Sequence, residues 1–344
     1  MNLLFFEFAT ATGSKDPSIS SEGLAMLEGL LTDLKGFNYY YLLSKQSNSY
    51  IDIINNYNQS KGLNPILFNC NLEKWLDNNI NKFDSCLFIA PEEDNVLYNL
   101  TKLIENKGVN VIGSDSNAVK VCSNKLETYD KLKNIVPIIK TEKVLFEEIN
   151  NYERFNKEFQ ENNKKIIKPV DGVSCSGVYV VRSYKELKTF ASLIKTNYPY
   201  FVMQDQVKGL PCSVSLLSDG INAIPLSLNA QDISIINKCE YKGGHIPLNH
   251  AMSTKAKKIA KETVEALPGI RGYVGVDLIL DDEVYVVEVN SRITTPYIGL
   301  RKIINFNLAK SIINSVKGIL PVNISLEGKV SFKKKGNQIY IDEN

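Results

Sequence analysis

The chain is poor in the residues that serve most often as metal ligands and nucleophiles. It has only two histidines, and its six cysteines stand at positions 70, 86, 122, 175, 212 and 239. No two cysteines form a Cys-x-x-Cys pair, and neither histidine stands at ligand spacing from a cysteine. This spacing argues against a zinc site or a disulfide framework, and it favours free thiols in a reducing cytosol.

Long apolar segments and strong net charge are also missing. No stretch approaches the roughly 20 apolar residues that are needed to span a bilayer. The run Leu3–Phe6 is interrupted by Glu7 and follows no basic region, so it lacks the features of a signal peptide. The formal net charge is +2, which gives no general attraction to nucleic acid or anionic lipid. We therefore expect a soluble, cytoplasmic protein without nucleic-acid or membrane partners.

Three widespread functional motifs are absent as well. No Gly-x-Gly-x-x-Gly follows the first expected strand, which disfavours an oxidoreductase that binds a dinucleotide. The chain has no Gly-x-x-x-x-Gly-Lys-Ser/Thr loop and no Gly-x-Ser-x-Gly turn for a serine nucleophile. His245 and His250 are therefore expected in polar loops, with His245 in a turn that follows Gly243 and Gly244.

The pattern of apolar residues predicts several lobes in a chain of 344 residues. Strands that alternate with helices predict a parallel sheet in the first lobe. We expect a helix over 116–135, a polar helix over 146–162, a strand pair on either side of residue 172, and a helix over 300–316. The expected domains are 1–114, 115–200 with a glycine- and serine-rich loop, 201–317 with many strands, and a tail at 318–344.

The most informative segment is a predicted hairpin over residues 272–292. Glu288 and Asn290 are two residues apart, so their side chains share one face of a strand. A two-residue loop at 282–283 places Asp277 opposite Glu288, and a two-residue loop at 281–282 keeps it on the same face. A three-residue loop without a bulge separates them. Convergence therefore requires a loop of even length or a bulge at residues 281–283.

Two carboxylates and an amide on one patch favour a cation. Like charges at that spacing repel by about 1 kcal/mol or more in a partly buried site. Ligands that are all oxygen select Mg²⁺ or Mn²⁺. These residues leave the number of ions open, and we expect two. Arg292 lies on the same face by parity and can form a bidentate contact with a phosphate. An amphipathic hairpin with a wet polar face is the alternative, and Asp277 with Arg292 favours a site.

Three other segments give weaker evidence of function when each is taken alone. Lys168 ends a strand before the small-residue loop 172–177, whose backbone N–H groups can close over phosphates, although an ordinary hairpin loop has the same composition. Taken by itself, Lys125 is interpreted as one of many surface lysines. The segment 202–209 offers a backbone edge to an adenine, or it is a plain edge strand.

Taken in their order along the chain, from Lys125 through Lys168 and the segment 202–209 to the hairpin, these segments resemble the ATP-grasp superfamily over residues 113–292. The resemblance implies an α/β protein with α+β lobes, in which a Rossmann-like, parallel-sheet pre-ATP-grasp domain precedes the ATP-grasp fold. It implies that Lys125 and Lys168 hold the phosphates of ATP, and that Arg292 and Lys168 are catalytic. The implied lid residues are Gly172, Ser174, Ser176 and Gly177. The implied adenine contacts are Gln204, Asp205 and Val207, and the implied metal ligands are Asp277, Glu288 and Asn290.

The sequence departs from the family pattern at one position, and other segments resemble one subgroup of the family. Pro211 stands where many members carry an acidic residue, which leaves ribose recognition open. Residues 5–10, the Glu22-Gly23 pair and segments 229–231 and 241–247 are similar to an archaeal subgroup, the tyramine–glutamate ligases of methanofuran biosynthesis. Candidate substrate contacts are Glu7, Asn229, Gln231, Gly243, Gly244 and Arg271.

The resemblance implies an ATP-dependent ligase for a small carboxylate and a small amine. Glutamate is expected to be activated at its γ-carboxylate as an acylphosphate, which tyramine then attacks. The alternatives are another ATP-grasp reaction, with a different acid and amine or a carboxylation, and a nucleotide-binding protein without catalysis. The sequence leaves the oligomeric state open, with a homodimer as one alternative.

Overall fold

The N-terminal domain is built on a parallel sheet. The computed structural model describes residues 2–14, 17–35, 38–46, 50–57, 62–173, 175–335 and 338–343, so Ser174 of the expected lid lies outside the described residues. The strands of this sheet lie in the order β3 (Leu63–Phe68), β2 (Tyr39–Ser44), β1 (Leu3–Glu7), β4 (Ser85–Ile89) and β5 (Asn110–Val111). The expected parallel sheet is confirmed, whereas β3 was not predicted.

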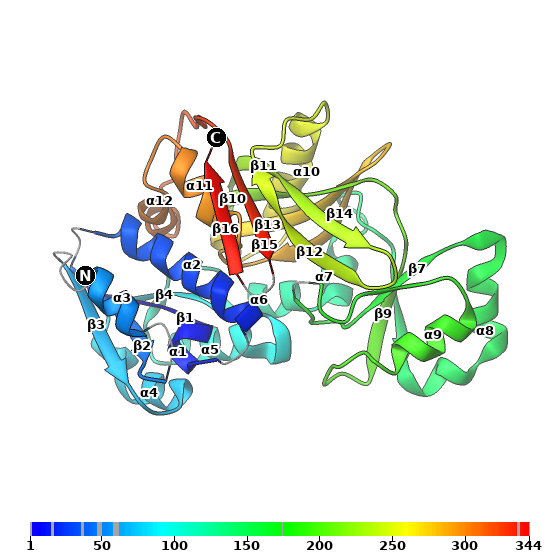
Figure 1. The fold of residues 1–344 in the computed structure, drawn as a ribbon, viewed down its shortest axis with the longest axis horizontal. Coiled ribbons are helices and arrows are strands. Elements are labelled where there is room, and N and C mark those ends of the chain that lie inside the picture. The colour runs from blue at the N-terminus through cyan, green and yellow to red at the C-terminus, as the bar shows by residue number, and fades with distance from the viewer. Residues whose placement is uncertain are drawn as a thin grey trace.

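Helices cover both faces of this sheet (Figure 1). They are α1 (Phe8–Thr12), α2 (Pro17–Asp33), α3 (Tyr50–Tyr57), α4 (Leu72–Asn79), the 3₁₀ turns η1 (Ile80–Lys82) and η2 (Glu93–Asn95), and α5 (Val96–Asn106). Alternate residues of β1 point to opposite faces. Leu4 and Phe6 join one core with α4 and α5, and Leu3 and Phe5 join a second core with α2.

The second core is shared with the C-terminal part of the chain. It includes Tyr297 and Leu300 of α11 (Tyr297–Ile303) and Ile312 of α12 (Leu308–Ser315). The helix expected over 300–316 is therefore two helices, because residues 304–307 leave the helical conformation and Asn307 caps the second helix. Burial of a common apolar core ties the first domain to the last one.

Two short helices connect the first domain to the next. The single helix expected over 116–135 is divided into α6 (Ser116–Ser123) and α7 (Lys125–Leu132). The residue between them, Asn124, has an extended backbone, and its side chain accepts hydrogen bonds from the N–H groups of Leu126 and Glu127. Such an N-cap starts a new helix, and it makes Lys125 the first residue of α7.

A small antiparallel sheet forms the lobe on the right of Figure 1. Its strands lie in the order β6 (Thr141–Leu145), β9 (Tyr200–Asp205), β7 (Lys165–Lys168) and β8 (Tyr179–Val181). Its helical segments are η3 (Phe146–Asn150), α8 (Tyr152–Asn156), η4 (Lys157–Asn162) and α9 (Tyr184–Ala191), so the helix expected over 146–162 is broken. Because β9 belongs to this sheet, the chain passes to the next sheet only after Asp205.

A large antiparallel sheet completes the molecule. Its strands lie in the order β14 (Val284–Asn290), β13 (Arg271–Leu280), β10 (Leu210–Asp219), β11 (Ala223–Ile235), β12 (Cys239–Ile246), β15 (Val330–Lys335) and β16 (Gln338–Glu343). Helix α10 (Ser253–Glu265) packs against this sheet. The expected strand pair after residue 317 extends the sheet at β12 and lies beside α2 in Figure 1.

None of the helices in the part of the chain that the structure describes is long and apolar enough to cross a membrane.

Candidate active site

The predicted hairpin forms, and Asp277 of β13 lies directly opposite Glu288 of β14. The strand register explains how this pairing arises. Leu280 pairs with Val284, so the loop has three residues, and a loop of that length alone would separate the two carboxylates. A β-bulge at Val287 restores the pairing, so the bulge falls within β14 rather than at residues 281–283. As a consequence, Val287 and Glu288 both face the same cleft.

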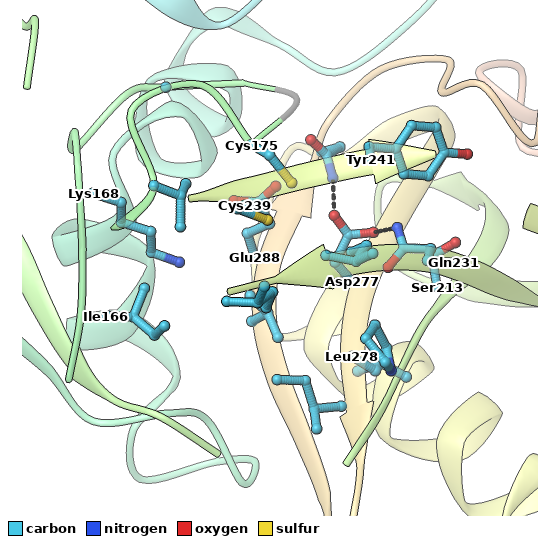
Figure 2. A pocket seen from close by; sticks show the side chains of 18 of the residues that line it. Ile166, Lys168, Cys175, Ser213, Gln231, Cys239, Tyr241, Asp277, Leu278 and Glu288 are labelled. Atoms are coloured by element: carbon cyan, nitrogen blue, oxygen red, sulfur yellow. Dashed lines mark hydrogen bonds between the residues drawn. The ribbon is translucent and has the colours of Figure 1, made fainter. Parts of the chain in front are cut away.

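That cleft is a cavity of about 230 Å³ between the small sheet and the large sheet. Figure 2 shows Lys168 entering it from the small lobe, opposite Glu288 and Asp277 of the large sheet. Its wall also includes the expected residues Lys125, Gly172, Gln204, Asp205, Val207, Gln231, Asn290 and Arg292. The structure therefore brings together residues from five of the segments that the sequence singled out.

The acidic part of the cleft is hydrogen-bonded on both sides. The amide of Gln231 donates to Asp277 Oδ1 at 3.0 Å (Figure 2). The amide of Asn290 donates to Asp277 Oδ2 at 3.2 Å. Burial and the neighbouring charge of Glu288 raise the pKa of Asp277. The pKa of Glu288 is lowered despite burial, because Lys125 and Lys168 face it. Two facing carboxylates with amide neighbours are a set of oxygen donors that fits Mg²⁺ or Mn²⁺.

Two lysines line the other side of the acidic patch. Lys125 Nζ lies 3.5 Å from Glu288 Oε2 and donates to the carbonyl oxygen of Gly172 at 2.7 Å. The side chain of Lys168 is buried. Burial lowers the pKa of Lys168, Glu288 opposes the shift and the charge of Lys125 adds to it, which together bring this pKa to about 8. The cleft thus holds one lysine charge that is sensitive to pH near neutrality.

With the phosphate-binding role that the family resemblance implies for Lys168, this pKa predicts a pH dependence for nucleotide binding. Lys168 is protonated below about pH 8 in the free protein and loses its charge above that value. We expect the Kd for ATP to rise by about tenfold for each pH unit above 8, until the affinity of the neutral form is reached. Calorimetric titration between about pH 6.5 and 9.5 measures it. Lys168→Arg keeps its charge and should flatten the curve, whereas an already flat wild-type curve would contradict the role of Lys168.

The loop after β7 turns tightly at two glycines. A Cβ on Gly172 would lie 2.5 Å from the Pro169 ring, and Gly177 has φ +67°, which favours glycine. Gly172 and Cys175 line the cleft, whereas Ser176 and Gly177 shape the turn without facing it. Cys175 approaches Cys239 of β12 in Figure 2.

The segment after β9 lines the same cleft. The side chain of Gln204 is buried and donates to Thr141 Oγ1 at 2.7 Å, so its amide is already engaged within the small sheet. Asp205 forms an ion pair with Lys165 at 2.8 Å. The apolar residues Ile139, Ile166, Leu278 and Ile279 line this part of the cleft, which we call the apolar slot. The sequence had not singled them out.

Arg292 reaches the cleft from the end of β14 and is held by the N-terminal domain. Its Nε donates to Glu92 Oε2 at 2.7 Å, and its Nη1 donates to the carbonyl oxygen of Ile293 at 3.3 Å. Glu92 follows β4, so the ion pair joins two domains. Glu92 Oε1 is buried and has no hydrogen-bond partner among the described residues. The ion pair orients the guanidinium while leaving Nη2 for a ligand.

Two candidate substrate contacts are structural. Glu7 is buried and caps α1 by accepting from the N–H groups of Ala9 and Thr10, each at 2.9 Å. Burial raises the pKa of Glu7 to about 7. Asn229 is fully buried and donates to Ser213 Oγ at 3.3 Å and Ser215 Oγ at 3.0 Å. Neither side chain lines the cleft.

The predicted turn at Gly243 and Gly244 is wrong, because both lie within β12, as does His245. A Cβ on Gly244 would lie 2.0 Å from the Ala230 carbonyl oxygen, and one on Gly243 would lie 2.1 Å from that of Phe332. Close strand packing therefore explains both glycines. Arg271 lies at the far end of β13, opposite Asp219 and away from the cleft wall.

The sequence reasoning missed the end of the cleft beside Arg292. This end is lined by Glu22 and Met26 of α2, Tyr241 of β12, and Thr295 and Pro296 after β14. The sequence singles out Glu22 only as part of a pair with Gly23. Glycine is needed at position 23, because a Cβ there would lie 2.3 Å from the Glu7 carboxyl carbon.

Comparison with known proteins agrees with this architecture. A sequence profile of the ATP-grasp domain matches residues 122–296, and one of the pre ATP-grasp 3 domain matches residues 66–119. A protein of Methanocaldococcus fervens named tyramine–L-glutamate ligase is 34% identical over 306 residues, which cover 87% of this chain and 89% of that protein. A protein of the same name from Methanocaldococcus jannaschii is 31% identical over 99% of this chain and 94% of its own.

A solved structure from Archaeoglobus fulgidus, assigned to the ATP-grasp superfamily, superposes with a TM-score of 0.71 and 25% identity, over 100% of this chain and 99% of that one. The profile match, the two relatives and the superposition agree on one fold. The chain therefore belongs to the ATP-grasp family.

Proposed function

We propose that the protein is an ATP-dependent ligase that joins the γ-carboxylate of L-glutamate to the amine of tyramine, with release of ADP and phosphate. Similarity over nearly the whole chain to two proteins named tyramine–L-glutamate ligase supports the substrate pair. The observation that carries the reaction class is the cleft itself, in which paired lysines face paired carboxylates beside Arg292. This arrangement suits a triphosphate chain, its counter-cation and an acid substrate.

In the proposal, ATP lies along the cleft between the two sheets. The adenine occupies the apolar slot between Ile166 and Ile279, next to the backbone of residues 204–207. Lys125 and Lys168 contact the phosphates, and Gly172 covers them with its loop. Asp277, Glu288 and Asn290 would hold Mg²⁺ or Mn²⁺, which neutralises phosphate charge during transfer when it is bound. The raised pKa of Asp277 fits this role, since burial and the facing charge of Glu288 both oppose its ionisation and a bound cation would offset them.

The reaction then needs no side-chain nucleophile. A γ-carboxylate oxygen of glutamate attacks the γ-phosphorus of ATP, and the bond to the ADP oxygen breaks. The amine of tyramine attacks the acyl carbon of the resulting acylphosphate, a C–N bond forms, and phosphate leaves with the C–O bond electrons. The amine releases its proton to solvent or to the departing phosphate. Arg292 neutralises charge on the transferring phosphoryl group, which is the main catalytic contribution in such reactions.

Exclusion of water is the second requirement, because an acylphosphate hydrolyses. The segment that follows the lid loop, at the start of β8, is anchored to the large sheet: Cys239 N–H donates to the Val178 carbonyl oxygen and Val180 N–H to that of Asn237, both at 3.0 Å. Lys125, bonded to Gly172, holds the same loop from inside the cleft. These contacts close the loop over the phosphate end.

Release of ADP in the presence of Mg²⁺, glutamate and a panel of amines tests the proposal. We expect turnover only when acid and amine are both present, with tyramine giving the highest kcat/KM and γ-glutamyltyramine as product. Equal rates with all amines would remove the tyramine assignment while leaving an acid–amine ligase. ADP release without any amine requirement would contradict ligation and favour a carboxylation or an ATPase reaction.

A further inference from the structure

One short loop of the N-terminal domain contacts both other parts of the molecule. We call it loop 92–95, after the residues that it comprises between β4 and α5. Its first residue, Glu92, accepts from Arg292 Nε of the large sheet at 2.7 Å. Two positions further along, the backbone N–H of Asp94 donates to Asp171 Oδ2 of the small lobe at 3.3 Å. The loop therefore lies between Arg292 and the small lobe.

The contact in the small lobe, Asp171, lies at the base of the lid. It immediately precedes Gly172, whose carbonyl oxygen accepts from Lys125 Nζ at 2.7 Å. Asp171 is only 2% exposed, and its carboxylate also accepts from Thr196 Oγ1 at 3.1 Å. A buried carboxylate is destabilised when such donors are removed, so Asp171 is held in place by its contact with Asp94. The base of the lid is thereby fixed to the N-terminal domain.

The backbone of loop 92–95 is strained where it meets the small lobe. Asp94 and Asn95 have φ angles of +55° and +58°, a left-handed conformation that residues other than glycine adopt at a cost. Two side chains of the small lobe contact these residues: the Asn197 amide donates to Asp94 Oδ1 at 2.8 Å, and the Tyr198 hydroxyl donates to Asn95 Oδ1 at 3.5 Å. The small lobe thus stabilises the shape of the loop that holds Arg292.

We propose that Asp171 is a positioning residue that couples closure of the lid to the orientation of Arg292. The proposal rests on the function proposed above, in which Arg292 acts on the transferring phosphoryl group. While Asp171 contacts the loop, Glu92 holds the guanidinium in place. When the small lobe moves away, the loop loses three hydrogen bonds and Arg292 loses a fixed partner. Phosphoryl transfer is thereby restricted to the closed cleft, where the acylphosphate is shielded from water.

Hydrogen exchange of the wild-type protein tests the coupling without any substitution. Residues 92–95 are all described by the structure and none of them lines the cleft, so a nucleotide in the cleft does not cover them. We expect a non-hydrolysable ATP analogue to slow exchange at the backbone amides of Asp94 and Asn95 by about threefold or more. Unchanged exchange at these two amides overturns the proposal, whether or not the lid itself is protected.

Replacement of Asp171 tests the effect on the reaction. Asp171→Ala should lower kcat by about tenfold or more and change the KM for ATP by less than about threefold. It should also raise the amount of ADP released per amide formed, because water then reaches the acylphosphate. Asp171→Asn keeps an acceptor for the Asp94 N–H and a contact to Thr196, so it should restore both values. Wild-type kcat in Asp171→Ala overturns the proposal.

A double-mutant cycle with Glu92→Ala distinguishes coupling from general destabilisation. If Asp171 and Glu92 act through one loop, Asp171→Ala combined with Glu92→Ala should lose about as much kcat as the more impaired single variant. Losses that multiply would overturn the proposal. Arg182→Met is the matched control, because Arg182 joins the small lobe to the large sheet through Asn237 Oδ1 at 3.0 Å rather than through loop 92–95. Its loss should multiply with that of Glu92→Ala.

Failure of the proposed function has a different signature. Absence of ADP release with glutamate and tyramine would overturn that function. The hydrogen-exchange result needs no turnover, so it would still decide whether Asp171 couples the lid to the loop that holds Arg292.

Discussion

Replacing Glu288 with glutamine should reduce kcat by about a hundredfold to a thousandfold while nucleotide still binds. Glu288 faces Asp277 across the hairpin and lies 3.5 Å from Lys125. The amide keeps the shape of the carboxylate but removes the charge that would hold a divalent ion. Lys125, Lys168 and the apolar slot remain to bind ATP. Steady-state ADP release and calorimetric binding of a non-hydrolysable ATP analogue measure the two effects separately.

Glu283→Gln is the matched control in the same hairpin. Glu283 lies in the loop and pairs with Lys255 rather than with the cleft. It should change neither kcat nor nucleotide affinity. Near wild-type turnover of Glu288→Gln at saturating Mg²⁺ would place the metal site elsewhere. Loss of turnover in both variants would point to general destabilisation of the hairpin.

Arg292→Lys should lower kcat by about a hundredfold or more, although the charge is kept. Lysine has no planar fork, so it cannot hold Glu92 through Nε and present a second N–H to the phosphoryl group. Glu92→Gln should have a smaller effect of the same kind, on kcat more than on the KM for ATP, because the amide oxygen still accepts from Nε. Full kinetic measurement on both variants checks this order.

Arg301→Lys is the corresponding control, since Arg301 is another interdomain arginine, bound to Asp33. It should reduce thermal stability and leave kcat unchanged. If Arg292→Lys raised the KM for glutamate with kcat unchanged, Arg292 would bind the acid in the ground state rather than stabilise the transfer. If Glu92→Gln matched the wild type in every constant, the ion pair would serve only to join the domains.

The hairpin shows how far the sequence could lead. Residue parity alone placed Glu288, Asn290 and Arg292 on one face, and the structure agrees. The pairing of Asp277 with Glu288 requires either a loop of even length or a bulge, and the residue types do not distinguish these two arrangements. A bulge at Val287 depends on how the strand packs at its centre, which no local signal marks. The same parity applied to Asp277 would have found Ile279, which also faces the cleft.

Polar and small residues misled the prediction where burial, rather than a ligand, explains them. Asn229 satisfies a buried network inside the sheet, and Glu7 caps a helix. Gly243 and Gly244 are small because neighbouring strands approach them closely, and such strands are remote in sequence. Glycine is typical of turns, so a strand that contains two of them was not recognised.

The remaining contacts join segments that lie far apart along the chain. The Glu92 carboxylate meets Arg292 across 200 positions, and Glu22 meets Lys334 across 312. A single sequence does not indicate such pairs, because they follow from how the domains pack. The family resemblance supplied the order of the phosphate and metal segments, but it gave no role to Glu92.

The fate of the substrate oxygen tests the central claim most directly. Glutamate labelled with ¹⁸O in its γ-carboxylate is incubated with ATP, Mg²⁺, tyramine and the protein, and the released phosphate is analysed by mass spectrometry. If the γ-carboxylate attacks ATP, one ¹⁸O atom appears in phosphate for each γ-glutamyltyramine formed. Unlabelled phosphate accompanying that product would contradict an acylphosphate intermediate and the account built on it.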